Sequence, residues 1–311
     1  MKRVAAIDIG TNSVLLLVAE VQGDDIVPLV ERATITRLGQ GVDRTRHLAP
    51  EAIERTLACL ERYAADIREH APESVFVVGT SAMRDAEGGA SFRESARAIL
   101  GVEPRVASGD EEAELTFLGS LSGLPIEGDV LVFDVGGGST EIIVGDSRTG
   151  PRAKISLDIG SVRLTERHVR ADPPGSEELR AVREDVRAAL AKVPFAPSGA
   201  VVGVAGTVTT LAAFVKDIAP YDAARVHGAE LLASEVASAA DRLAALPLDQ
   251  RKALPAIDPK RADVIVAGAV LVDELLRFCG AERVVVSDRG VRWGLVVRAL
   301  RQSPGARAPI H

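Results

Sequence analysis

The sequence predicts an α/β protein with two domains that face each other across a cleft. Short apolar runs typical of buried strands alternate with longer amphipathic stretches typical of helices. One pattern occurs twice: an apolar run, an aspartate, a glycine turn and a second apolar run. The two aspartates, Asp8 and Asp134, are 126 residues apart in a chain of 311 residues. A repeat on this scale indicates two related domains, and the chain is long enough for both.

The first copy begins with the apolar run 4–7 and Asp8, continues with the turn 10–13 and resumes as an apolar run at 13–19. Glycine permits the sharp turn because it has no Cβ. A turn of small residues exposes backbone N–H groups, which together form an anion-binding nest. A third strand is expected at 26–30. The predicted phosphate-binding residues of this copy are Gly10, Thr11, Asn12 and Ser13.

The second copy has the run 130–133, then Asp134, a glycine-rich turn and the run 141–144, with a third strand at 153–157. Two such turns on opposite sides of a cleft would hold phosphates between them, with carboxylates nearby. The predicted phosphate-binding residues of this copy are Gly136, Gly137, Gly138, Ser139 and Thr140.

The remaining elements follow from periodicity, caps and breakers. Strands are expected at 74–78, 102–106, 200–204 and 283–286, and helices at 50–70, 90–100, 108–121, 176–193, 231–246, 261–278 and 291–301. The strand 200–204 is expected to end in a turn at 205–210, followed by a helix to Val215. Proline and glycine make 123–128 the best linker. The domains are therefore expected at 1–124 and 125–311, with the closing helix near 290–302 packing back on the first and a frayed tail from 303.

Composition excludes several classes of function. The net charge of −7 and an aromatic content of 3% argue against a nucleic-acid-binding protein. Cys59 and Cys279 lie in apolar helical stretches, which favours buried thiols in a reducing compartment over a disulfide. The first apolar run breaks at Asp8, too early for a signal peptide or a membrane span. We therefore expect a cytoplasmic protein with no membrane or nucleic-acid partner.

Several acids are candidate metal ligands. Asp8, Asp134 and Glu141 offer oxygen atoms, which suit Mg²⁺, with Mn²⁺ as the alternative. The five histidines show no metal-ligand spacing, and neither a P-loop nor a dinucleotide fingerprint is present. Arg84 follows a strand at the end where α/β sheets bind ligands. Glu112 stands beside Glu111 at a helix start, where acids are often only favourable to the helix dipole.

Six motifs in order resemble one family, the exopolyphosphatase / guanosine pentaphosphate phosphohydrolase family (Ppx/GppA), over about residues 3–300. They are the segments 8–13, 79–84, 108–113, 134–141, 206–207 and 287–290. The resemblance implies two ribonuclease-H-like domains, as in the superfamily of actin, the sugar kinases and the heat-shock chaperone ATPases. It also implies the short form of the family, without the C-terminal helical phosphohydrolase domain of longer members.

The resemblance also implies roles for single residues. Glu112 matches the catalytic glutamate that orients or activates water. Arg84 matches a phosphate-contacting arginine, and Asp134 matches a metal-binding acid. Glu141 matches a further acid. A further loop of the family matches Gly206 and Thr207, and we count it as phosphate-binding. Leu15 and Trp293 depart from the family. Many members have a polar or basic residue at the first position and an acid at the second.

The leading hypothesis is a metal-dependent exopolyphosphatase that acts on inorganic polyphosphate. The alternatives are hydrolysis of guanosine pentaphosphate to the tetraphosphate, a kinase of the sugar or acetate type, and a non-catalytic sensor of polyphosphate or alarmones. A homodimer is also compatible with the sequence. A basic patch for polyphosphate would draw on Arg163, Lys260, Arg261, Arg289 and Arg292.

Overall fold

The computed structural model describes residues 2–23, 25–87 and 89–301, so the tail from 303 lies outside the described residues. The chain forms two compact units. Unit 1 comprises residues 1–119 together with 291–311, and unit 2 comprises residues 120–290. The sequence placed the boundary at 124/125; in the structure it falls at 119/120, and the last helix belongs to unit 1.

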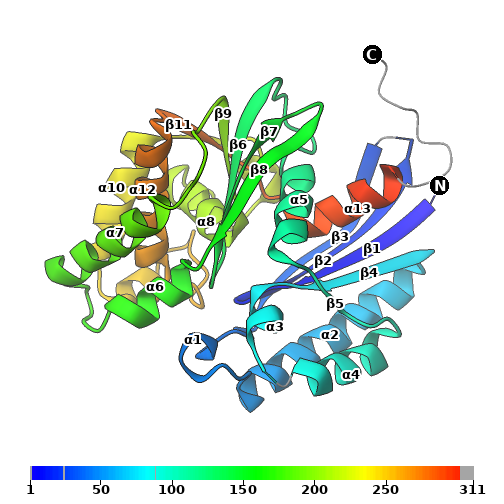
Figure 1. Cartoon of the computed structure of the whole chain (residues 1–311). Coiled ribbons are helices and arrows are strands. Elements are labelled where there is room, and N and C mark those ends of the chain that lie inside the picture. The colour runs from blue at the N-terminus through cyan, green and yellow to red at the C-terminus, as the bar shows by residue number, and fades with distance from the viewer. Residues whose placement is uncertain (1, 24, 88, 302–311) are drawn as a thin grey trace. The chain divides into compact units, whose positions relative to one another are not determined.

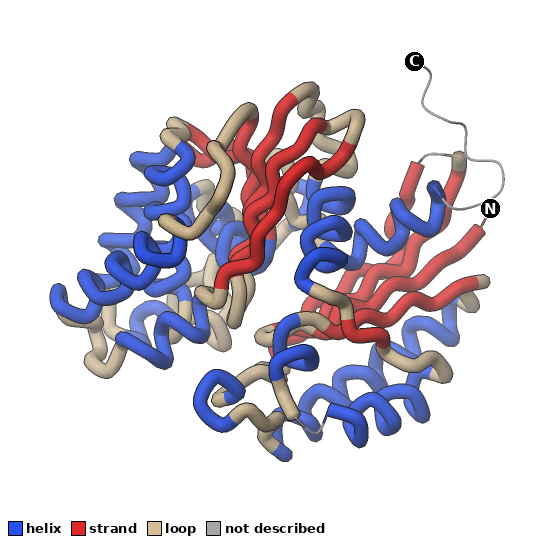
Figure 2. The backbone as a smooth tube through the Cα atoms, viewed as in Figure 1, coloured by secondary structure: helices blue, strands red, loops and turns tan. Residues whose placement is uncertain are grey.

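Unit 1 is built on a five-stranded mixed sheet with the order β3-β2-β1-β4-β5 (Figures 1 and 2). The strands are β1 (Lys2–Ile9), β2 (Ser13–Gln22), β3 (Asp25–Ile35), β4 (Ser74–Gly79) and β5 (Arg105–Val106). The helices are α1 (Val42–Thr45), α2 (Pro50–His70), α3 (Ser81–Asp85), α4 (Gly89–Leu100), α5 (Gly109–Ser120) and α13 (Val291–Arg301).

Both faces of this sheet are covered because β1 is apolar on both sides. Successive side chains of a strand point to opposite faces. Ala5 and Ile7 pack with apolar residues of α2 and α4, and Val4 and Ala6 pack with those of α5 and α13. Figure 1 shows α13, in red, lying along β1. Trp293 is buried in the second of these clusters, so this departure from the family has a packing role.

Unit 2 is built on a six-stranded sheet with the order β10-β11-β9-β6-β7-β8. The strands are β6 (Asp129–Val135), β7 (Thr140–Asp146), β8 (Gly150–Leu157), β9 (Ala200–Val204), β10 (Glu230–Leu232) and β11 (Arg283–Val286). The helices are α6 (Ser161–His168), α7 (Ser176–Leu190), α8 (Ala205–Val215), α9 (Ala223–Val226), α10 (Ala233–Ala244), α11 (Leu248–Lys252) and α12 (Ile265–Cys279).

The two sheets share topology and register. In unit 1, β1 lies between antiparallel β2 and parallel β4; in unit 2, β6 lies in the same way between β7 and β9. Asp8 is opposite Val78 of β4, and Asp134 is opposite Val204 of β9. Since 126 residues also separate these two valines, the repeat extends well beyond the turns that revealed it.

Three predicted elements need correction. The first two residues of the helix expected at 231–246 belong to β10 instead, because Leu231 pairs with Val284 at the sheet edge and sheet pairing overrides helix propensity. The helix expected from 261 begins only at Ile265, and the strand expected at 102–106 spans Arg105–Val106. Helix α6 was not predicted; it starts where the backbone N–H groups of residues 161–163 bond to the second glycine turn.

Both cysteines are free thiols. Cys59 is fully buried, as expected, whereas Cys279 is only partly buried at the end of α12. Burial raises the pKa of the Cys279 thiol to about 12, so the thiolate is scarce at neutral pH. Within the described residues, no helix combines the length and apolarity that crossing a membrane requires.

An ion-pair network with two buried carboxylates joins α7 to α12 in unit 2. Arg183 Nη1 lies 2.6 Å from Asp273 Oδ2 and 2.9 Å from Glu274 Oε1, and Arg187 Nε lies 2.6 Å from Glu274 Oε2. Burial alone would raise the pKa of Glu274, but hydrogen bonds from Arg187 and Arg183 outweigh it and lower the pKa below its ordinary value. The carboxylate therefore stabilises the folded state while it is ionised.

We expect Glu274→Gln to lower the free energy of unfolding at pH 7 by about 2 kcal/mol, because two charge-assisted hydrogen bonds are weakened. The stabilisation by the ionised Glu274 carboxylate is fully present above the pKa of the unfolded state, about 4.3. It is lost as the pH falls through the lower pKa of the folded state. Denaturant unfolding at several pH values should therefore show the gap between wild type and variant narrowing below about pH 4.3. A gap independent of pH would contradict this account.

Candidate active site

The first glycine turn is closed by a hydrogen bond from Gly10 N–H to the Ser13 carbonyl, at 2.9 Å. A Cβ on Gly10 would lie 3.0 Å from that carbonyl oxygen, which explains the glycine. The backbone N–H groups of Thr11 and Asn12 donate to no other residue in the described part of unit 1. The Asn12 side chain is 7% exposed, and its Oδ1 also has no partner there. The turn therefore offers polar groups that only a ligand or water can satisfy.

Helix α3 lies directly beside this turn. Its first residue, Ser81, shares a 2.6 Å hydrogen bond between its Oγ and Thr11 Oγ1, and the Thr80 N–H donates to the Ile9 carbonyl. The sequence predicted a loop at 79–86 because the helix is only five residues long. Ser81 was also missed, since an isolated serine carries no signal of its own.

Arg84 and Glu112 come together although 28 residues separate them. Arg84, at the end of α3, places Nη1 2.9 Å from Glu112 Oε2 and 3.3 Å from the Ala107 carbonyl. Glu112 lies in the first turn of α5, where its N–H donates to the Ser108 carbonyl, and it is 7% exposed. Turn, arginine and glutamate therefore form one connected set in unit 1.

The neighbouring acid has a different environment. Glu111 forms ion pairs with Arg105 and with Arg298 of α13, the latter at 2.6 Å. The hydrogen bond from Arg105 holds the pKa of Glu111 below its ordinary value, against the effect of burial and with help from Arg298. Consecutive helical residues point about 100° apart, so only one of the two acids can face Arg84. In the structure that acid is Glu112.

The second glycine turn repeats the first. Gly136 N–H donates to the Ser139 carbonyl at 3.0 Å, and the N–H groups of Gly137 and Gly138 have no partner among the residues described. The carbonyls of Gly136 and Gly137 accept hydrogen bonds from the first turn of α6. Gly160 packs directly on the backbone of Gly137 and Gly138. The turn is therefore held from behind by α6 and the residue that precedes it.

Two carboxylates stand opposite each other at the start of this turn. Asp134 on β6 is the cross-strand partner of Glu141 on β7. Glu141 is 2% exposed, and its Oε1 accepts a 2.7 Å hydrogen bond from Ser156 of β8. In unit 1 the residue opposite Asp8 is Leu15, so that copy lacks the second acid.

The donor set of unit 2 fits Mg²⁺, because this ion is often held by one or two carboxylates with water and phosphate as further ligands. Among the described residues, no group of three or more histidine, cysteine or acidic side chains is placed to hold a metal. Asp8 belongs to unit 1, whereas Asp134 and Glu141 belong to unit 2.

Gly206 and Thr207 lie at the start of α8, where β9 ends. The preceding residue, Ala205, has φ of +71°, a left-handed conformation that is uncommon for a residue with a side chain. The guanidinium of Arg261 packs directly over Gly206, and its burial lowers the pKa of Arg261. Thr207 is buried against Gly268 of α12, so its side chain has a packing role.

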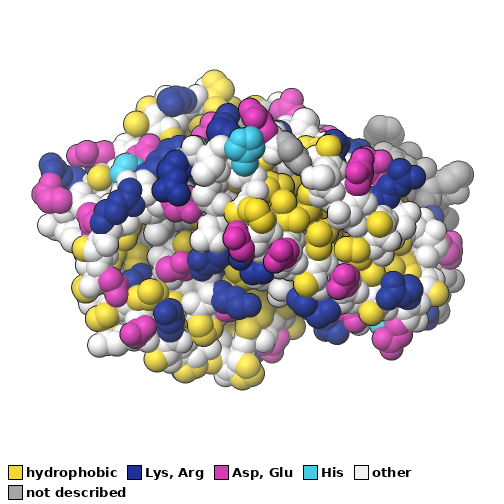
Figure 3. All heavy atoms as spheres, turned by 90° about the horizontal axis from the view of Figure 1, so that it is seen from below, with side chains coloured by type: hydrophobic (Ala, Val, Ile, Leu, Met, Phe, Trp, Pro, Cys, Tyr) yellow, Lys and Arg dark blue, Asp and Glu magenta, His cyan; other side chains and the backbone are white. Residues whose placement is uncertain are grey.

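Three arginines expected in a basic patch are engaged within their own unit. Arg163 is 3.1 Å from Asp158, Arg292 is 2.8 Å from Glu31, and Arg289 donates to the Ser122 carbonyl at 2.8 Å. Figure 3 shows acidic and basic side chains interspersed over the face that it draws.

Comparison with known proteins gives consistent likenesses. The model of the Ppx/GppA phosphatase family matches residues 17–303. "Exopolyphosphatase 2" of Mycobacterium tuberculosis is 40% identical over 96% of this chain and 98% of its own. "Guanosine-5'-triphosphate,3'-diphosphate pyrophosphatase" of Pseudoalteromonas atlantica is 34% identical over 59% of this chain and 36% of its own.

Among solved structures, the Ppx/GppA family member of Aquifex aeolicus superposes with a TM-score of 0.84 at 35% identity. It covers 98% of this chain and 99% of its own. This likeness, with the sheet orders given above, confirms the expected fold class, in which each unit is a ribonuclease-H-like α/β domain.

Proposed function

The chain belongs to the Ppx/GppA phosphatase family, and from this premise we propose that it is an exopolyphosphatase. It would remove the terminal orthophosphate of inorganic polyphosphate by attack of water. The observation that carries the proposal is the Arg84–Glu112 pair, with its buried carboxylate, beside a turn in which the backbone N–H groups of Thr11 and Asn12 have no partner in the described chain. A cation, a carboxylate and an anion-binding nest are what phosphoanhydride hydrolysis requires of a protein.

In the proposed reaction the turn 136–140 binds phosphate oxygens through its backbone N–H groups, and the turn 10–13 holds those of the terminal phosphate in the same way. Arg84 draws negative charge from the same phosphate and fixes the Glu112 carboxylate. Glu112 orients a water in line with the scissile bond and accepts its proton. The water oxygen bonds to the terminal phosphorus, the bridging P–O bond breaks, and the polymer leaves one phosphate shorter.

We further propose that Asp134 and Glu141 hold Mg²⁺, with Asp8 as an additional acid and Mn²⁺ as a substitute. The bound ion would neutralise charge on the phosphate oxygens. Ser156 is a positioning residue in this scheme, because its hydrogen bond fixes the Glu141 carboxylate. Gly206 and Thr207 remain proposed contacts through the backbone at the start of α8.

The extent of similarity favours polyphosphate over guanosine pentaphosphate. The relative named as an exopolyphosphatase matches along nearly its whole length, whereas the relative named as a guanosine pyrophosphatase matches along about a third of its own. Leu15 opposite Asp8 offers no polar contact for a nucleotide phosphate.

The test is orthophosphate release from short polyphosphate, long polyphosphate, guanosine pentaphosphate and ATP, each with Mg²⁺ and with EDTA. We expect release from polyphosphate to exceed the others by at least about tenfold and to stop when the metal is removed. A preference for guanosine pentaphosphate would replace the proposal with its alternative. Folded protein that is inactive on all four would favour a binding sensor.

A further inference from the structure

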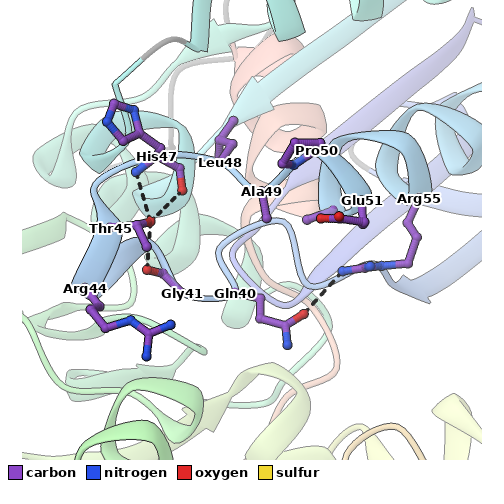
Figure 4. Close-up of a pocket in the computed structure, with 11 residues that line it drawn as sticks. Gln40, Gly41, Arg44, Thr45, His47, Leu48, Ala49, Pro50, Glu51 and Arg55 are labelled. Carbon is purple, nitrogen blue, oxygen red and sulfur yellow. Dashed lines mark hydrogen bonds between the residues drawn. The ribbon is translucent and has the colours of Figure 1, made fainter.

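Unit 1 has an exposed hollow of about 470 Å³ between the segment that follows β3 and the first turns of α2 (Figure 4). Its lining combines cationic, amide and apolar side chains with one acid and one histidine, and it has no phenylalanine, tyrosine or tryptophan. The lining residues are Gln40, Gly41, Arg44, Thr45, His47, Leu48, Ala49, Pro50, Glu51, Ala52 and Arg55.

The hollow begins one residue away from contacts with the first glycine turn. The N–H groups of Thr36 and Arg37 both donate to the Asn12 carbonyl at 3.0 Å, and the Gly39 N–H donates to the Thr11 carbonyl at 2.9 Å. Gln40 follows at once and lines the hollow. Consecutive Cα atoms are about 3.8 Å apart. A ligand held at the turn 10–13 therefore lies within a few such steps of the hollow.

The charges of the hollow suit an anion. Arg44 and Arg55 approach it from different elements, α1 and α2, with Gln40 between them (Figure 4). Arg55 is fixed, because its Nε donates to the Thr36 carbonyl at 3.0 Å and its Nη2 lies 3.4 Å from Gln40 Oε1. The Arg44 side chain is exposed and makes no ion pair or hydrogen bond with any described residue. Glu51 is the acid among the lining residues described.

We propose that this hollow binds phosphates of the polyphosphate chain beyond those held at turn 10–13, with Arg44 and Arg55 as the contacting cations. The inference rests on the proposed function and adds a second subsite to it. A linear polyanion fits better than a nucleoside, because the lining offers two guanidinium groups for phosphate oxygens and no phenylalanine, tyrosine or tryptophan ring for a base to stack on.

The first test is kinetic. Arg44→Glu should raise KM for long polyphosphate about tenfold with kcat changed less than about twofold, because a cation–phosphate contact becomes a repulsion. KM for tripolyphosphate should not change, because we expect its three phosphates to be held at the turn 10–13 without reaching the hollow. The matched control is Arg62→Glu, the same charge change at an exposed arginine of α2 outside the hollow and without a partner in the described chain. Equal effects of both variants, or equal effects on both substrates, would overturn the proposal.

The second test measures binding without turnover. Long polyphosphate is titrated into Glu112→Gln protein over a salt series, with and without Arg44→Ala. Removal of one phosphate contact should reduce the slope of log Kd against log salt by about 0.7. This readout separates the two proposals. Absence of hydrolysis by the wild type would refute the exopolyphosphatase activity, whereas an unchanged slope would refute phosphate binding in the hollow.

Discussion

Glu112→Gln is expected to fold like the wild type and to lose about 10²- to 10⁴-fold in kcat on polyphosphate. The amide has the shape of the carboxylate and can still accept the hydrogen bond from Arg84 that the structure shows at 2.9 Å. It cannot accept a proton from water, and it orients water less strongly. Orthophosphate release gives the rate, and thermal unfolding followed by circular dichroism checks the fold.

The matched control is the neighbouring acid. Glu111→Gln makes the same chemical change one residue earlier, at a carboxylate bound to Arg105 and Arg298. We expect its kcat to stay within about twofold of the wild type, with a small loss of stability from the weakened ion pairs. Near-native turnover by Glu112→Gln, or an equal loss in both variants, would refute the role given to Glu112.

Gly160→Ala is expected to lower kcat by about 10²-fold although residue 160 touches no substrate in the proposed reaction. A Cβ at this position would lie 2.6 Å from the Gly137 carbonyl carbon and 2.8 Å from the Gly138 nitrogen. Backbone atoms cannot yield as a flexible side chain can, so the turn 136–140 must move. A displacement of about 1 Å in a phosphate-holding turn is enough for such a loss.

A glycine without close neighbours provides the comparison for this variant. Gly175 precedes α7, and its added Cβ would meet only the end of the Glu178 side chain at 3.9 Å. Gly175→Ala should therefore leave kcat unchanged in the same assay. Wild-type activity in Gly160→Ala would mean that the second turn does not bind phosphate in the reaction.

The strands and glycine turns could be predicted because their signals are local. Apolar runs such as 4–7 and 130–133 end at an acid and a glycine, and the structure places a strand end and a turn at both. The helix α2 was predictable for the same reason, since its buried residues recur at helical spacing and Pro50 marks its start.

The contacts that assemble the site were less predictable because they join distant segments. Arg84 and Glu112 each look like ordinary surface residues in sequence, and only the fold brings their side chains together. The distinction between Glu111 and Glu112 depends on Arg298, which lies 187 residues away from Glu111. Ser156 and Gly160 carry no sequence signal, because their importance comes from what packs against them.

Unit 1 is completed by the last helix of the chain, and this has a consequence for synthesis. The chain leaves the unit after Gly119 and returns at Val291. Until α13 arrives, one apolar face of the sheet, including Val4 and Leu17, lacks the cover that Trp293 and its neighbours provide. At about 5 to 20 residues per second, the ribosome needs about 10 to 35 s for the intervening stretch. During that time the nascent first unit exposes a surface that chaperones can bind, and slow translation of unit 2 prolongs that exposure.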